Sequence, residues 1–329
     1  MGVKAKVVTW LALVAVSGGM AVQTLASPEP APRRLGPGGC RLLPHDDAFH
    51  RKVHKLPEAS NSESIISQIL ADGGDYLHPD FGPGGNYGIP FEVVGPRQHR
   101  VPVKIRAYPS QSDPGPHPIP RKAAIEGGQR SSGDRHVLVL QRDGADRNRT
   151  CRLIELYRAF PRSGPKHGWF ADSVAVFNLG RRLPHRPPYW TSADAAGLPI
   201  LPGLVRLAEV RSGRINHAIR MTFTRTRQAF RSPATHHASE DCHPHRPPMG
   251  MRLRLDDDYP TAGMHPHAQV IAKALKRFGA IVADNGSNFF FTGARDARWS
   301  DDPLDDLKTI PGAAFEVVRT PGSRLTTPC

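Results

Sequence analysis

Apolar and polar residues alternate along several short stretches of the chain, and a period of two is typical of strands with one buried face. Two such runs, 87–94 and 101–108, flank a polar turn and predict an antiparallel pair. Three more predict a meander within one sheet: HVLVLQRD (136–143), CRLIELYRAF (151–160) and WFADSVAVFNL (169–179). Further strand-like runs lie at 215–224, 249–256, 280–284, 287–293 and 313–320. The Asn285-Gly286 step between two of them predicts a hairpin turn.

Three stretches instead repeat apolar residues every three to four positions, which predicts helices. The clearest is 267–279, where Val270, Ile271 and Leu275 share one face and Gly279 ends the helix. The others are 61–71 and 300–310, and Ser192 is a candidate cap for a helical turn at 194–196. Pro (33) and Gly (31) interrupt the chain too often for a helical bundle. The sequence therefore predicts a mainly β fold: a single-domain antiparallel β-sandwich or jelly-roll-like body with two or three peripheral helices.

The N-terminal residues have the pattern of an export signal. Lys4 and Lys6 precede the apolar run 7–16, which is too short to span a bilayer, and small residues follow at 24–27. We expect a signal peptide over 1–26, a Pro/Gly-rich linker over 27–39, a β-rich domain over 40–320 and a tail over 321–329. The mature protein is then secreted, extracellular or periplasmic, without a transmembrane anchor.

Four cysteines are spread along the chain at Cys40, Cys151, Cys242 and Cys329, with no CxxC pair. Structural zinc sites need clustered ligands, so this spacing favours disulfides in an oxidising compartment. Two bonds with three possible pairings follow, and the spacing does not choose among them.

The chain is strongly basic, with 44 Lys and Arg and a formal net charge of +14. The arginines are scattered and match no DNA-binding module, so no nucleic acid partner is expected. For an exported protein, a polysaccharide, possibly acidic, is the partner that this charge favours. An arginine-rich surface without any specific partner is the alternative.

Several long strings resemble one family of secreted bacterial proteins. They include IEGG with SGDRHVLVL, WTSADAAGLPILPGLVR and ADNGS, and the resemblance extends over nearly all of the chain after about residue 40. No activity is established for that family. The resemblance therefore implies a single secreted unit and assigns no functional residue.

The stretch EGGQRSSGDRH holds the first candidate site residues. Glu126, Asp134 and His136 lie within eleven positions, and the glycines between them permit close approach of a ligand. Two carboxylates on neighbouring turns suit acid–base cleavage of glycosidic bonds. A polar turn before a core strand is the structural alternative, with Asp134 capping that turn.

Asp194 and His217 complete the catalytic candidates. Asp194 lies in a small apolar segment, where an unpaired carboxylate is costly to bury. His217 precedes Arg220 on a predicted strand, and a histidine satisfied within the core is the alternative. Arg220 and Arg252 are the residue types that neutralise a uronate carboxylate.

Three further residues are candidates for substrate binding: Asp284 and Asn285 through sugar hydroxyls, and Trp190 through stacking on a sugar ring. The His-rich loop 236–245 matches no zinc motif, so no metal is expected. Glycine patterns for nucleotides are also absent, and no cofactor is expected.

These features predict a secreted carbohydrate-active protein, namely a glycoside hydrolase or a polysaccharide lyase that acts on an extracellular or envelope polysaccharide. A non-catalytic module that binds extracellular glycan or envelope is the alternative, and the residues leave open whether the protein is an enzyme. The spatial arrangement of the candidate residues distinguishes an enzyme from a binding module. An enzyme needs its carboxylates and histidines to converge, whereas a binding module can leave them dispersed.

Overall fold

The computed structural model describes residues 1–2, 36–84, 87–142, 151–162 and 167–329. Leu35–Cys329 form one folded unit, which alone is considered below. Residues 3–26 of the expected signal peptide and residues 27–35 of the expected linker lie outside the described residues, and so do residues 143–150 between two of the predicted strands.

The largest sheet has six strands in the order β1-β13-β9-β12-β11-β14. Their bounds are β1 His78–Asp80, β13 Phe290–Thr292, β9 Ile219–Phe223, β12 Ala280–Asn285, β11 Arg252–Leu255 and β14 Phe315–Val317. One face of this sheet is apolar and is covered by helices. The helices are α1 Ser62–Ala71, α2 Leu207–Arg211, α3 Pro266–Arg277 and α4 Asp302–Leu307.

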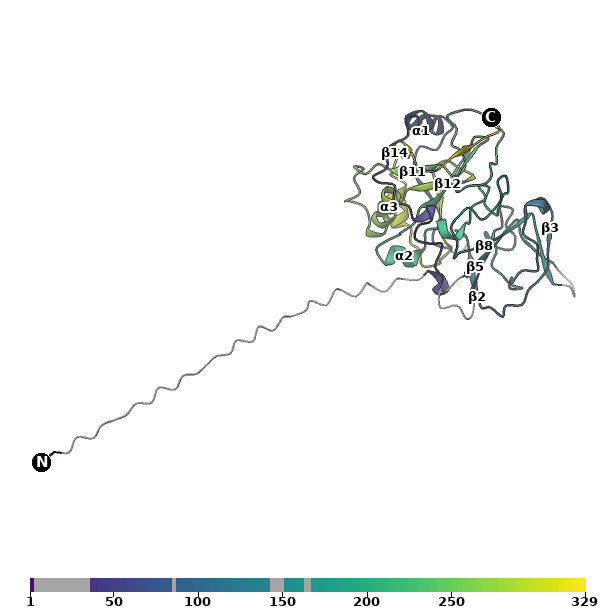
Figure 1. Ribbon diagram of the computed structural model, residues 1–329, viewed down its shortest axis with the longest axis horizontal. Helices are drawn as coiled ribbons and strands as arrows, with labels where there is room; N and C mark the ends of the chain where they lie inside the picture. The colour runs from purple at the N-terminus through teal and green to yellow at the C-terminus, as the bar shows by residue number, and fades with distance from the viewer. Residues whose placement is uncertain (3–35, 85–86, 143–150, 163–166) are drawn as a thin grey trace. The chain divides into compact units, whose positions relative to one another are not determined.

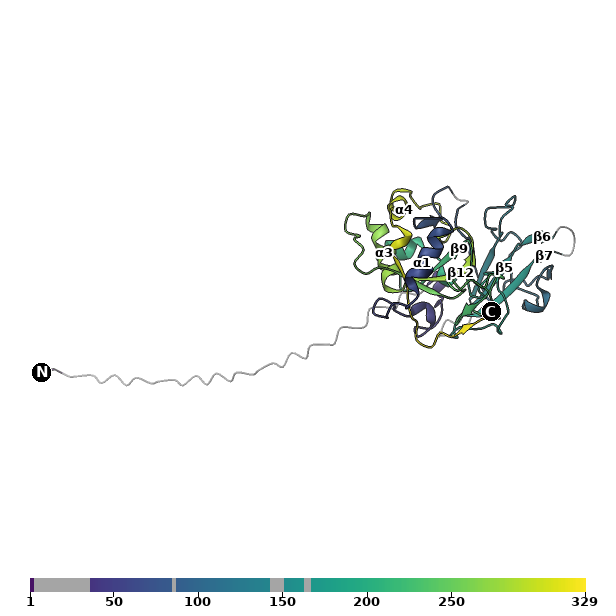
Figure 2. The same cartoon turned by 90° about the horizontal axis from the view of Figure 1, so that it is seen from above.

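A second body of strands forms the other side of the unit (Figures 1 and 2). Its four-stranded sheet consists of β2 Phe91–Val94, β4 Val137–Arg142, β5 Cys151–Tyr157 and β8 Ser173–Asn178, in that order. Its three-stranded sheet consists of β3 Val103–Ile105, β7 Gly168–Ala171 and β6 Phe160–Arg162. A separate apolar cluster that includes Ile119, Val137 and Trp169 fills the space between these sheets. A two-stranded ribbon pairs β10 Phe230–Arg231 with β15 Leu325–Thr326.

The prediction of a mainly β fold is confirmed, and so is most of the meander, although 169–171 of its third run belong to β7 and residue 160 to β6 in the three-stranded sheet. β4, β5 and β8 are antiparallel neighbours in one sheet, because the turns between successive runs leave each strand beside the next. The three predicted helices correspond to α1, α3 and α4. In α3, Ile271 and Leu275 are buried, and Gly279 follows the helix with φ +70°, a backbone conformation that L side chains rarely adopt.

The pairing of strands differs from the antiparallel expectation. The pairs β1–β13, β9–β12, β2–β4 and β3–β7 are parallel, so the sheets are mixed. Residues 87–94 and 101–108 do not pair with each other, since β2 joins β4 and β3 joins β7. The sandwich or jelly-roll arrangement stays a prediction.

The hairpin predicted at Asn285-Gly286 is wrong, because β9 lies between β12 and β13. Gly286 does not have the positive φ that a tight primed turn needs, and its α-carbon packs against Thr222 of β9. The Asn285 side chain bonds to Thr226 Oγ1 at 2.7 Å and to the carbonyl of Ala238. Local turn chemistry is therefore overridden by insertion of a central strand.

The turn at 194–196 is also not helical. Ser192 Oγ nevertheless accepts the Asp194 amide at 2.9 Å, which is the local bond expected of a serine cap.

Two disulfides connect segments far apart in sequence, Cys40–Cys151 and Cys242–Cys329. The first joins a buried N-terminal segment to β5, and the second attaches the C-terminal residue to the His-rich loop. Among the described residues, no helix has the length and apolar character needed to cross a bilayer.

We predict that the two disulfides differ in their contribution to stability. The closed loops are of similar length, 111 and 87 residues, so chain entropy alone gives similar contributions. Replacing Cys40 and Cys151 with Ala also leaves a cavity in the core, and we expect a loss of roughly 3–5 kcal/mol in the free energy of unfolding. The Cys242→Ala/Cys329→Ala variant is the matched control, with a smaller loss in urea denaturation. Equal losses would contradict the added role of burial.

Candidate functional site

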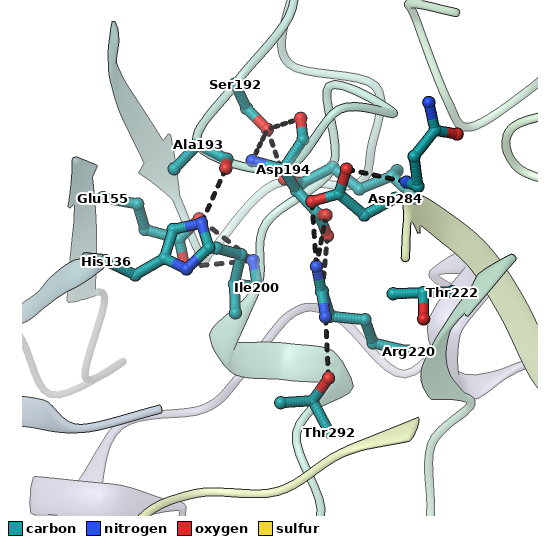
Figure 3. Close-up of polar contacts among 12 residues, drawn as sticks. His136, Glu155, Ser192, Ala193, Asp194, Ile200, Arg220, Thr222, Asp284 and Thr292 are labelled. Carbon is teal, nitrogen blue, oxygen red and sulfur yellow. Dashed lines mark hydrogen bonds and ion pairs between the residues drawn. The ribbon is translucent and has the colours of Figure 1, made fainter. Parts of the chain in front are cut away.

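A buried arginine connects two carboxyl groups on the polar face of the six-stranded sheet (Figure 3). Arg220 donates to both oxygens of Asp194, from Nε at 3.0 Å and from Nη2 at 2.8 Å. Its Nη2 also lies 3.1 Å from Asp284 Oδ2, and Nη1 donates to Thr292 Oγ1 at 2.7 Å. Two carboxyl groups and a hydroxyl thus hold the guanidinium, and Arg220 is only 5% exposed.

Strand alternation explains why Arg220 is found there. Ile219, Met221 and Phe223 of β9 belong to the hydrophobic core, so Arg220 and Thr222 point to the opposite face. A register shift in the β9–β12 pair then places Asp284, instead of Ala283, opposite Thr222. This bulge brings the Asp284 carboxyl group to the face that carries Arg220.

Asp194 is supplied by a buried irregular segment, residues 191–204. The segment is anchored to the six-stranded sheet by Ala196, whose amide donates to the carbonyl of Ala283 at 2.9 Å. On its other side it is held by Glu155 of β5, which accepts the amides of Ile200 and Leu201 at 3.0 Å. The backbone amides of a buried loop need hydrogen-bond acceptors. Here the acceptors are the Glu155 carboxylate from one sheet and the Ala283 carbonyl from the other.

His136, at the start of β4, is the second anchor of this segment. Its Nε2 lies 3.0 Å from the carbonyl of Ala193, and its Nδ1 lies 2.6 Å from Glu126 Oε2. Both partners are acceptors, so only the doubly protonated imidazolium satisfies both contacts. Burial opposes that charge, but the charge and hydrogen bond of Glu126 outweigh it and raise the pKa of His136 to about 9.

The pKa values of the carboxyl groups around Arg220 are shifted in different directions. Burial, the Asp194 charge and a hydrogen bond with Asp194 hold the pKa of Asp284 well above its ordinary value, against the opposing effect of Arg220. Burial would also raise the pKa of Glu126, but the adjacent His136 lowers it overall. Burial raises the pKa of Glu155 to about 7, although the Ile200 and Leu201 amides oppose this.

Only part of this cluster reaches solvent. The side chains of Glu126 and Asp284 are 25% and 18% exposed, whereas Asp194 is 1% exposed and Glu155 is fully buried. Asp80 lies close enough for Glu126 to affect it, and burial followed by that charge raises its pKa. Solvent therefore reaches the side chains of Glu126 and Asp284, whereas those of Asp194 and Glu155 are covered.

Five of the residues predicted from the sequence come together here: Glu126, His136, Asp194, Arg220 and Asp284. Asp134 is exposed at the edge, near enough to raise the pKa values of Asp80 and Tyr157, in each case after burial. Their functional roles stay predictions.

The other predicted residues lie in different surroundings. His217 bonds to Glu209 and Arg206, and Arg252 donates to the carbonyls of Ala48 and Phe278. Trp190 stacks under the Arg186 guanidinium at 5.4 Å, and the Asn285 amide is bound to Thr226 and Ala238.

Sequence reasoning missed Glu155. It lies inside the apolar run CRLIELY, and the only signal was a carboxylate in the middle of a strand predicted to have neighbours on both sides.

In the part of the chain that the structure describes, no group of three or more His, Cys, Asp or Glu side chains is arranged to hold a metal ion.

No protein-family model, curated protein or solved structure matches this chain. Its function is therefore inferred from the residues and their geometry alone.

We predict that Arg220→Met strongly destabilises the fold, because it leaves Asp194 buried without a counter-charge. Breaking a buried ion pair in this way costs roughly 3–5 kcal/mol in the free energy of unfolding. Urea denaturation measures the loss, and adding Asp194→Asn should recover part of it. Arg106→Met breaks a more exposed pair with Asp172 and is the control, with a much smaller effect because solvent screens that pair. Equal losses in the two arginine variants would contradict the central role of Arg220.

The raised pKa of His136 predicts how stability depends on pH. A folded-state pKa above the unfolded value of 6.5 gives stability that is fully present below pH 6.5 and is lost as pH rises through about 9. The part that His136 contributes is on the order of 3 kcal/mol. In His136→Gln the part of this fall that the imidazole causes should disappear, leaving a shallower slope from carboxyl groups with raised pKa values such as Asp284, whereas exposed His243→Gln should keep the full fall. An unchanged slope in His136→Gln would show that the imidazole is not charged in the folded protein.

Proposed function

We propose that this protein is a secreted glycoside hydrolase acting on an extracellular or envelope polysaccharide. Asp284 is the general acid and Glu126 the general base. The proposal rests on two carboxyl groups that are both partly exposed, both within the field of Arg220, and shifted in opposite directions, with the pKa of Asp284 raised and that of Glu126 lowered. Export is favoured by the N-terminal signal pattern and by the two disulfides.

The proposed chemistry is cleavage by water. Asp284 donates its proton to the glycosidic oxygen as the bond to the anomeric carbon breaks. Glu126 takes a proton from the water that attacks that carbon, so one proton is delivered and one is removed. The Asp284 carboxylate that remains lies 3.1 Å from Arg220 Nη2, which stabilises its new charge. A general acid thus has its counter-charge already in place.

Hydrolysis is favoured over a lyase reaction by the bonding of Arg220. A lyase needs a cation to neutralise the substrate's uronate carboxylate. Arg220 already makes four hydrogen bonds, to Asp194, Asp284 and Thr292, and it is 5% exposed. It is therefore committed to the protein's own groups.

A non-catalytic glycan-binding module is the second candidate, and the burial of the network favours it. Asp194, His136 and Glu155 are closed to solvent and hydrogen-bonded, which suits a purely structural role. Tyr108 and Tyr189 are 40% and 47% exposed and offer faces on which sugar rings stack.

We predict that Asp284→Asn and Glu126→Gln each lower polysaccharide cleavage by about 100-fold or more while the protein stays folded. Reducing-end release across a panel of polysaccharides measures this, and exposed Asp258→Asn is the matched control. On an activated aryl glycoside of the same sugar, Asp284→Asn should lose much less activity, because a good leaving group needs no acid. Wild-type activity should fall on the acid side as Glu126 is protonated, and on the alkaline side as Asp284 loses its proton.

Two outcomes would redirect the proposal. Full activity in folded Asp284→Asn on polysaccharide would remove it from the mechanism. No release from any polysaccharide, together with co-sedimentation of the wild type with one of them, would establish the binding module instead.

A further inference from the structure

A separate hollow of about 530 Å³ opens where five segments of the chain meet. These segments are 46–51, 181–183, 232–233, 250–252 and 320–323. Four arginines line it, Arg51, Arg181, Arg182 and Arg252, together with only two acidic residues, Asp46 and Asp47. The lining of the hollow therefore carries more basic than acidic side chains.

Both aspartates are already engaged. Asp47 is 2% exposed and accepts the amide of Phe49 at 2.9 Å and that of Leu183 at 2.8 Å. Asp46 pairs with Arg182 at 3.2 Å. Among the described residues, no carboxylate lies within ion-pair distance of Arg51, Arg181 or Arg252.

Arg252 is the most unusual of the three because it is 4% exposed. Its Nη1 donates to the carbonyl of Phe278 at 2.8 Å and its Nη2 to that of Ala48 at 2.7 Å, and both are neutral acceptors. Burial, and then the nearby charge of Arg51, lower its pKa to about 10, with Asp47 opposing. A buried cation that makes no ion pair with a carboxylate is costly, and an anion in the hollow would lower that cost.

We propose that this hollow binds an oxyanion, that is, a sulfate, phosphate or carboxylate group. Arg51 and Arg181, both exposed at its edge, supply the direct donors, and Arg252 supplies a fixed positive charge from below. Arg252 lies opposite Ile281, and Ile281 lies opposite Arg220, so Arg252 is two strands away from Arg220. The inference does not depend on the proposed hydrolysis.

The test is isothermal titration of the full chain with sodium sulfate, sodium phosphate and a galacturonate tetramer at constant ionic strength. We expect saturable binding of at least one probe. The Arg51→Gln/Arg181→Gln variant should weaken it at least tenfold, whereas Arg252 is left intact because its loss endangers folding. The matched control is Arg97→Gln/Arg130→Gln, which removes the same charge from exposed positions outside the hollow and should bind as the wild type does.

The probes also identify the source of the anion. Binding of inorganic sulfate or phosphate indicates a free oxyanion, and binding of the tetramer alone indicates a carboxylate carried by an acidic glycan. Absence of saturable binding with all three probes overturns the proposal. Equal weakening in the two double variants also overturns it, because it would reflect net charge and not the hollow.

Discussion

The bidentate pair between Arg220 and Asp194 is the interaction on which the candidate site depends. Arg220 belongs to the six-stranded sheet, and Asp194 belongs to the segment that lies between this sheet and β5. Both side chains are almost fully buried, so neither can be satisfied by water. Each would be a strongly unfavourable charge without the other, and this makes their separation costly. The pair therefore fixes how residues 191–204 sit on the polar face of the sheet.

On its opposite side, residues 191–204 are held by two buried polar side chains, which are uncommon in the interior of a sheet. Glu155 accepts two backbone amides, and His136 meets the carbonyl of Ala193. A loop at this depth is tolerable only when its donors and acceptors are paired. His136, just before β4, and Glu155 of β5 thus connect the second body of strands to the segment through hydrogen bonds. These bonds fix the position of Asp194 more closely than an exposed loop would.

Much of this was accessible from the sequence where the signal is local. Alternation over 215–224 predicts the strand that forms β9, and apolar spacing predicts α3 to within about two residues. Non-local choices were not accessible. The Asn285-Gly286 step indicates a hairpin, yet β9 enters between its two arms, because burying Ile219, Met221 and Phe223 outweighs a favourable turn. The convergence of Glu126 with Asp194, and the register shift that turns Asp284 toward Arg220, likewise depend on tertiary pairing.

Charge balance explains why the pKa values of the carboxyl groups are shifted in different directions. Two buried cations, Arg220 and His136, face Asp194, Glu126, Asp284 and Glu155. Asp194 is matched by Arg220, and Glu126 by His136 at 2.6 Å. Asp284 shares the Arg220 guanidinium with Asp194, and no ion pair joins Glu155 to a cation in the described part of the chain, so burial raises the pKa of both carboxyl groups. Of these two, Glu155 is sealed beneath the loop, whereas Asp284 is partly exposed. A raised pKa at a partly exposed position, beside an arginine that can stabilise the anion left behind, is what the proposed role of general acid requires.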